Sequence, residues 1–191
     1  MNTVATSAAQ GQAAAKVKRR ELLPFDHPLH LAAHRFLVEE AYALDERDFE
    51  AWLDMLAPTI RYQVPVTTTA ARGGRSHKTG DMDHYDEDMF SLRMRVDRLH
   101  TNFAWAEDPP SRTRRLLGNV CVYADSTESE LQVRSYFQLF RSRGDLRSPD
   151  LLSGMREDVL LRDAAGTLRL QQRTVTLDES VLRTQNLALF L

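Results

Sequence analysis

The sequence predicts an α+β domain, in which helices near the N-terminus cover one face of a curved, mostly antiparallel sheet. Three observations favour this fold class. Apolar residues recur with helical spacing in segments that precede residue 100. Segments of alternating apolar and polar residues follow, as expected for antiparallel strands that bury one face. The chain has 191 residues, which is enough for one domain with a sizeable core.

The composition argues against several kinds of partner. Hydrophobic residues make up 42% and charged residues 27% of the chain, and a net charge of −2 gives no general attraction to nucleic acid or to an anionic membrane. No apolar run approaches the roughly 20 residues that span a bilayer. The first residues lack the pattern of a secretory signal, so we expect a cytoplasmic protein.

The N-terminal region divides into a tail and a helix. Residues 1–21 contain no aromatic residue and are rich in Ala, Gln, Ser and Lys, so we expect a mobile tail before a single domain over residues 22–191. Asp26 and Pro28 indicate the start of the first helix, which we expect over residues 29–44.

Two further helices are expected before residue 100. Asp45 is expected to cap the second helix, which Pro58 ends. Residues 67–80 contain three glycines without apolar periodicity and are expected to form a loop. Asp81 or Asp83 is expected to cap the third helix. Its buried side would consist of Met89, Leu92, Val96 and Leu99.

Long strands account for most of the remaining chain. We expect them over residues 60–66, 116–123, 131–139, 151–162 and 168–177. Pro65 favours an edge position for the first of these strands. The apolar phase shifts between Leu170 and Val175, which indicates a bulge. The segment from Leu182 to Leu191 is too apolar to stay exposed, so it should pack on its own sheet or on a partner.

One loop carries the most specific motif in the chain, W-A-E-D-P-P-S-R-T-R-R-L-L-x-N-V, which begins at Trp105. This run resembles the small (beta) subunits of aromatic-ring-hydroxylating, Rieske-type dioxygenases. Residues 41–56, 154–162 and 174–191 provide supporting matches. The resemblance implies a cystatin-like or nuclear-transport-factor-2-like cone, with helices packed on the sheet.

The resemblance also implies a function. The chain would be a non-catalytic subunit in a hexamer of three large and three small subunits, which converts an aromatic compound to a cis-dihydrodiol with O₂ and NAD(P)H. The Rieske [2Fe–2S] cluster and the mononuclear Fe(II) would lie in the large (alpha) subunit, and a reductase would supply electrons. Cys121 is the only cysteine, whereas a Rieske cluster needs two Cys and two His. We therefore expect no catalytic, cofactor-binding or metal-binding residue in this chain.

The loop around Trp105 has two compatible interpretations. It can be a packed loop in which Arg112 or Arg114 pairs with Glu107 or Asp108, or it can be a subunit contact, because Trp and Arg are favoured at interfaces. The subunit-contact hypothesis includes Trp105, Pro109, Pro110, Arg112, Arg114, Arg156 and Phe190. Charged positions in the late strands, among them Arg156, Asp158 and Arg173, fit either a polar subunit contact or a solvated strand face.

A second hypothesis comes from a different class of protein. Some proteins with this fold use the conical pocket as an isomerase or dehydratase site, and His84 beside Asp83 and Asp86 offers a candidate proton-transfer group. These acidic residues are more simply explained as the start of a helix. A stand-alone enzyme that acts on a small cyclic substrate is therefore the alternative.

Overall fold

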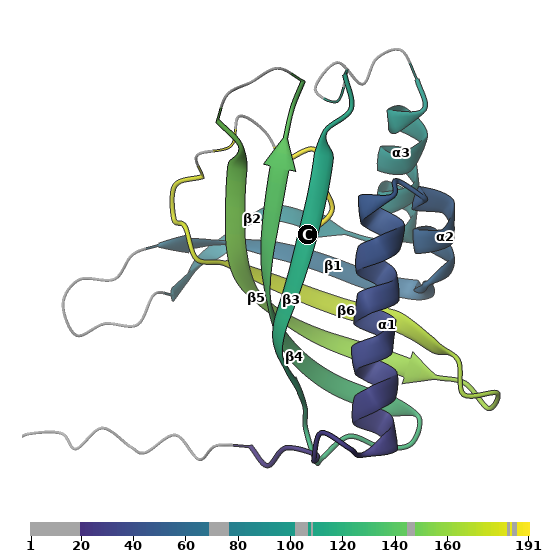
Figure 1. Ribbon diagram of the computed structural model, residues 1–191. Coiled ribbons are helices and arrows are strands. Elements are labelled where there is room, and N and C mark those ends of the chain that lie inside the picture. The colour runs from purple at the N-terminus through teal and green to yellow at the C-terminus, as the bar shows by residue number, and fades with distance from the viewer. Residues whose placement is uncertain are drawn as a thin grey trace, which may run out of the picture.

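In the computed structural model, the described residues are 20–68, 77–101, 107, 109–144, 148–182, 184 and 187–191. Within them, three helices pack on one face of a six-stranded, curved sheet (Figure 1). The helices are α1 (Pro28–Asp45), α2 (Phe49–Asp54) and α3 (Met89–Leu99). The strands are β1 (Leu56–Thr68), β2 (His77–Glu87), β3 (Arg112–Val122), β4 (Glu130–Ser142), β5 (Asp150–Arg162) and β6 (Leu168–Leu177).

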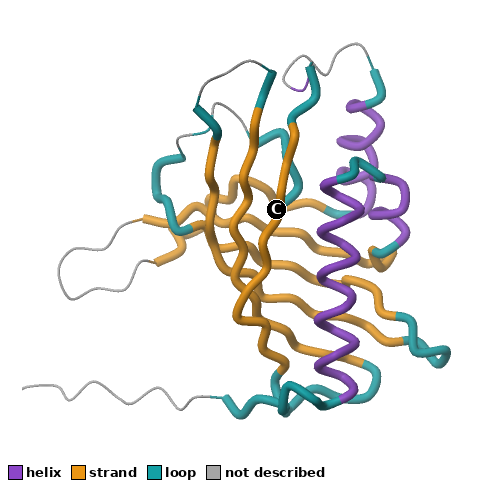
Figure 2. Tube along the Cα trace, in the orientation of Figure 1, coloured by secondary structure: helices purple, strands orange, loops and turns teal. Residues whose placement is uncertain are grey.

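The strand order is β2-β1-β6-β5-β4-β3, and the sheet curves around α1 (Figure 2). The pairing is antiparallel except between β1 and β6, which run parallel. The predicted α+β class, with early helices on a mostly antiparallel sheet, is confirmed. No helix in the described part of the chain has both the length and the apolar character of a membrane-spanning segment.

The first helix begins and ends close to the predicted positions, whereas the second is shorter than predicted at both ends, and the capping of both helices differs. The side chain of His27, rather than that of Asp26, accepts the first backbone N–H of α1. Asp48 caps α2, whereas Asp45 was predicted to do so. Asp45 is the last residue of α1, and its carboxylate binds β3 instead. The second helix ends at Asp54, four residues before Pro58, and Pro58 lies within β1.

The prediction for the third helix was wrong at its start. Residues 77–87 form β2, and Asp88 caps α3 through a capping box with Ser91. The acidic residues before Asp88 resemble a first helical turn, but pairing with β1 overrides this local preference. Of the predicted loop, residues 69–76 lie outside the described residues, and the remainder belongs to β1 and β2.

Pro65 was predicted to mark an edge strand, yet β1 lies between β2 and β6. The pairing with β2 shifts register on both sides of Pro65, and the recorded pairing with β6 ends at Gln63. The missing N–H of Pro65 therefore falls where the ladder is already irregular. The bulge predicted in β6 is confirmed, because its pairing with β5 shifts between Leu170 and Gln172.

The two ends of the described chain are held on the sheet. Residues 1–19 of the predicted tail lie outside the described residues, but the guanidinium of Arg20 lies 2.5 Å from the carboxylate of Asp125 and 3.7 Å from the ring centre of Tyr123. The backbone carbonyl of Glu21 accepts a hydrogen bond from Ala124. At the other end, three residues are buried in the core, Leu189, Phe190 and Leu191. The apolar end therefore packs on its own chain.

Gly154 of β5 tests how tightly the inner face of the sheet is packed. A Cβ at this position would lie 2.5 Å from the backbone oxygen of Thr176 and 3.0 Å from the ring of Phe137. We expect Gly154→Ala to lower the free energy of unfolding by about 1–3 kcal/mol, as overpacked sites do. Gly118→Ala is the matched control, because nothing lies within 4 Å of its added Cβ. Urea unfolding of both variants checks this, and equal effects would contradict it.

Candidate functional site

The space between the helices and the sheet is filled by large side chains. Trp52 of α2 is fully buried, and the ring of Phe190 packs against it with ring centres 4.2 Å apart. The ring of Phe49 meets Phe190 edge-on at 5.9 Å. A cavity of only about 20 Å³ remains beside these rings, less than the volume that a substrate needs. Beside these rings, the described residues therefore leave no room for a substrate.

A buried ionic cluster joins α1 to the two strands beneath it. The guanidinium of Arg173 in β6 binds both oxygens of Glu40, at 2.6 and 2.8 Å, and both oxygens of Asp158, at 2.8 and 2.9 Å. The indole N–H of Trp52 donates to Glu40 at 3.2 Å. All three charged residues are at most 3% exposed. Two carboxylates and one guanidinium leave one negative charge, which the buried guanidinium of Arg156, 3.7 Å from Glu40, balances.

The charges in this cluster set the protonation state of Glu40. Burial raises the pKa of Glu40, but the neighbouring charges of Arg173 and Arg156 outweigh burial and hold that pKa below its ordinary value. Burial lowers the pKa of Arg173, but Asp158 and Glu40 raise it well above the ordinary value. Both groups therefore stay charged at neutral pH, and neither is poised to exchange a proton.

Arg156 was predicted to lie at a subunit contact, but it is 1% exposed and lies inside the chain. Its guanidinium lies 4.8 Å from the ring centre of Phe137 and 3.7 Å from a carboxylate oxygen of Glu40. Its three nitrogens have no hydrogen-bond partner among the described residues. Burial lowers the pKa of Arg156 to about 10, which still leaves it charged at pH 7. The sequence did not reveal this burial, because charged strand positions usually face solvent.

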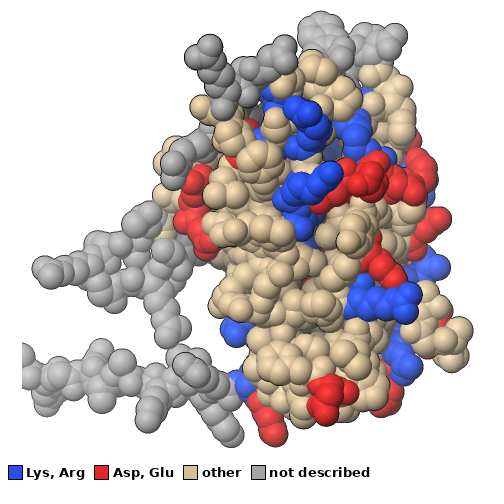
Figure 3. Space-filling model, viewed as in Figure 1, with Lys and Arg blue, Asp and Glu red and all other residues tan. Residues whose placement is uncertain are grey.

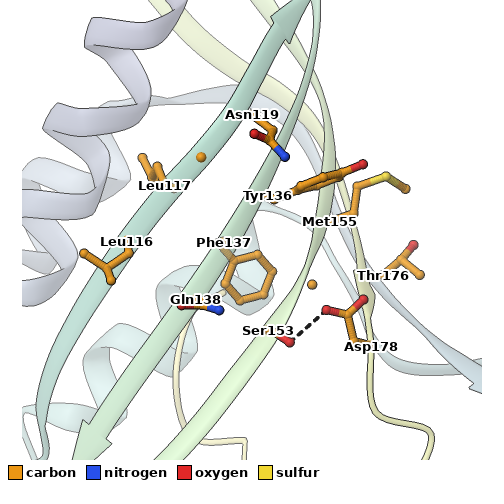
Figure 4. A pocket seen from close by; sticks show the side chains of 12 residues that line it. Leu116, Leu117, Asn119, Tyr136, Phe137, Gln138, Ser153, Met155, Thr176 and Asp178 are labelled. Carbon is orange, nitrogen blue, oxygen red and sulfur yellow. Dashed lines mark hydrogen bonds between the residues drawn. The ribbon is translucent and has the colours of Figure 1, made fainter.

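The sheet face opposite the helices, here called the outer face, carries a hollow of about 560 Å³ (Figure 4). Cross-strand neighbours place Leu116 beside Gln138, and Tyr136 beside Met155. The hollow is lined by Leu116, Leu117, Gly118, Asn119, Tyr136, Phe137, Gln138, Ser153, Gly154, Met155, Thr176 and Asp178. Four large apolar residues of these strands are at least 43% exposed: Leu116, Tyr136, Phe140 and Leu151.

The predicted contact residues separate into two groups. Pro109, Pro110, Arg112 and Arg114 are exposed at and before the start of β3, and Arg114 is the cross-strand neighbour of Phe140. Figure 3 shows basic side chains gathered over the upper part of β3. Phe190 is buried, like Arg156, and Trp105 lies outside the described residues.

The loop before β3 is fixed by an ion pair that was not predicted. Glu107 is buried and accepts a hydrogen bond from Arg141 of β4 at 2.5 Å, instead of pairing with Arg112 or Arg114. Ser111 donates to the same carboxylate through its hydroxyl, at 3.1 Å. Asp108 lies outside the described residues. This pair holds the exposed residues Pro109 and Pro110 at one end of the outer face.

The alternative proton-transfer site is not assembled in the described residues. His84, Asp83 and Asp86 are all exposed on β2. The hydroxyl of Tyr85, which follows His84 along the strand, donates to the backbone of Leu187 in the interior. His84 lines neither hollow described above. Among the described residues, no three His, Cys, Asp or Glu side chains lie close enough to hold a metal ion.

Residues 39–184 match the family model of ring-hydroxylating beta subunits, and the chain belongs to this family. It is 38% identical over 83% of its length to the N,N-dimethyl phenylurea N-demethylase subunit beta of a Sphingobium species, covering 89% of that protein. It is 32% identical over 92% of its length to the benzene 1,2-dioxygenase subunit beta of Pseudomonas putida, covering 96% of that protein.

Solved structures agree with this assignment. A chain in the structure of naphthalene 1,2-dioxygenase with bound indole is 31% identical, with a TM-score of 0.75 and 84% coverage of both chains. The beta subunit of benzoate 1,2-dioxygenase from Burkholderia mallei, at 18% identity and a TM-score of 0.66, shows the fold alone, over 86% of this chain and 97% of that one. The predicted cystatin-like or nuclear-transport-factor-2-like fold is confirmed.

Removing the charge of Arg173 should lower the free energy of unfolding more than removing the charge of Arg156. Arg173→Met leaves two buried carboxylates without their partner, so we expect it to lower the free energy of unfolding by about 3–5 kcal/mol. Arg156→Met removes a charge that balances Glu40 but no hydrogen bond among the described residues, so we expect a smaller loss, of about 1–2 kcal/mol. Denaturant unfolding of the two variants compares them, and equal losses would be inconsistent with this account.

Glu40 should make stability depend on pH in the acid range. Its folded-state pKa is lowered, so its stabilising effect is complete above the unfolded pKa of about 4.3 and is lost as pH falls through the folded pKa. We expect Glu40→Gln to be less stable than the wild type at pH 7, and the difference to shrink below about pH 4. Urea titrations from pH 7 to pH 3 test this. Glu39→Gln is the control at the neighbouring position: it removes only an exposed ion pair with Arg35, so it should change stability by less than about 1 kcal/mol.

Proposed function

We propose that this chain is the non-catalytic small subunit of a Rieske-type oxygenase that acts on aromatic compounds. The match to the beta-subunit family over residues 39–184 carries this proposal. The filled interior and the exposed positions of His84, Asp83 and Asp86 are consistent with it. The chain would stabilise and orient a large subunit in which the reaction takes place.

The cofactors then belong to the large (alpha) subunit. A Rieske [2Fe–2S] cluster takes two Cys and two His, whereas Cys121 is the only cysteine of this chain. The large subunit would hold this cluster and a mononuclear Fe(II), and a reductase would pass electrons from NAD(P)H. The overall reaction would be aromatic compound plus O₂, NAD(P)H and H⁺ to cis-dihydrodiol plus NAD(P)⁺.

The outer face supports a subunit contact. Exposed aromatic and aliphatic side chains around a hollow, flanked by arginines, are typical of the centre and rim of a protein interface. Arg112 and Arg114 lie at the end of this face where Pro109 and Pro110 are exposed. We assign these four residues, together with Trp105, to the contact with the large subunit. Arg156 and Phe190 would support it only through the fold, because they are buried.

The assembly would contain three large and three small subunits in the cytoplasm. Co-expression with a candidate large (alpha) subunit from the same genome tests the proposal. We expect one complex whose mass fits three of each subunit, and aromatic-dependent oxygen uptake only with the large subunit and reductase present. Turnover of a cyclic ketone by the isolated chain, lost in His84→Ala, would instead favour the stand-alone isomerase or dehydratase.

A charge placed in the hollow tests the contact itself. We expect Tyr136→Glu to reduce co-purification with the large subunit at least tenfold, because the buried carboxylate would lack a partner. Tyr42→Glu is the matched control, since Tyr42 is 67% exposed on α1, away from the sheet. Both isolated variants should keep the wild-type melting temperature. If Tyr136→Glu co-purifies with the large subunit as well as the wild type does, the outer face does not form the contact.

A further inference from the structure

Residues 187–191 are held in the interior by side chains rather than by strand pairing. Four side chains from three strands and α3 donate hydrogen bonds to their backbone carbonyls: Tyr62, Tyr85, Arg95 and Arg115. Arg115, for example, donates to the carbonyl of Phe190 at 2.6 Å. The segment is thus bound as a ligand is bound, by donors that converge from several elements.

The ring of Phe190 lies in a cage of three side chains. The ring centre lies 4.2 Å from that of Trp52 and 5.9 Å from that of Phe49. The guanidinium carbon of Arg95 lies 4.5 Å from the same ring centre. The phenyl ring is 2% exposed, so this cage encloses it almost completely. A cation near an aromatic ring attracts its π-face, which an aliphatic group of the same size lacks.

The walls of the cage are held by contacts that do not involve residues 187–191. The indole N–H of Trp52 donates to Glu40, and Arg95 forms an ion pair of 2.7 Å with Glu87. Phe49 begins α2, which Asp48 caps. Side chains locked by such supporting contacts keep their geometry when the group they bind is removed. The cage should therefore persist without the Phe190 ring.

We propose that Phe49, Trp52 and Arg95 form an aryl-binding site that the ring of Phe190 fills in cis. When that ring is absent, the site takes a neutral molecule with a single aromatic ring. The size of the site sets the limit of one ring, and Arg95 sets the preference for an aromatic over an alicyclic ligand. This inference is independent of the proposed function, because it concerns only contacts within the chain.

The test uses the full chain with Phe190→Ala and two probes of similar size, toluene and methylcyclohexane. Apolar cavities left by large-to-small substitutions stay dry and bind such molecules. Both probes are compared at one free concentration, equal to 100 times the Kd of toluene, at which we expect toluene to raise the melting temperature by about 5–10 °C. Methylcyclohexane should raise it by less, and the wild type should respond to neither probe.

Two further variants separate an aryl site from an ordinary cavity. Adding Arg95→Met to Phe190→Ala should abolish the preference for toluene. Phe36→Ala empties a buried position for which the described residues show no ring or cation contact, and it should show no preference. Equal responses to both probes in Phe190→Ala would overturn the proposal. If Phe190→Ala does not fold alone, it is refolded in the presence of each probe at the same free concentration, and equal recovery of folded protein with toluene and with methylcyclohexane would overturn the proposal as well.

Discussion

The fold depends on the attachment of α1 to the sheet through Glu40, Arg173 and Asp158. The guanidinium of Arg173 forms two bidentate pairs, one with the helix and one with the neighbouring strand. A planar donor group of this kind fixes direction as well as distance, so it sets the rotation of α1 about its axis. That rotation places Leu37 and Leu44, both at most 2% exposed, in the core. Apolar burial supplies most of the stability, and the ionic cluster selects one arrangement of helix on sheet.

The same attachment explains why the interior is closed. Glu40 accepts from Trp52, Trp52 packs on Phe190, and Arg115 joins the backbone of Phe190 to Asp45 at the end of α1. Helix, sheet and the segment 187–191 are thus linked through one set of contacts. A protein built in this way has its accessible concavity on the other side of the sheet, at the hollow around Tyr136. This is why the proposed contact with the large subunit is placed on the outer face.

Sequence patterns predicted the elements well where one periodicity dominated. The alternation of apolar and polar residues over 131–139 correctly predicted the buried face of β4. The helical spacing of apolar residues correctly predicted α1. Predictions failed where pairing across the chain decided the outcome. Residues 81–87 have the acidic pattern of a helix start, but they pair with β1 and form part of strand β2. Arg173 looks like a solvent-facing residue, but it is buried against Asp158 of the neighbouring strand and against Glu40, which is 133 positions away in the chain. Separations of this length leave no local signal, and the aryl cage depends on the same kind of distant contact.

The names of two relatives show that small subunits of one family occur in enzymes named for different reactions. The chain is 38% identical to a subunit named for N-demethylation and 32% identical to one named for dioxygenation of benzene. Subunits named for two different reactions are thus both similar to this chain over most of its length. Two chemistries on one small-subunit fold imply that the bond to be broken is chosen elsewhere in the complex. In the function proposed for this chain, that choice would fall to the large subunit, because the described interior is occupied by Phe190 and by paired charges.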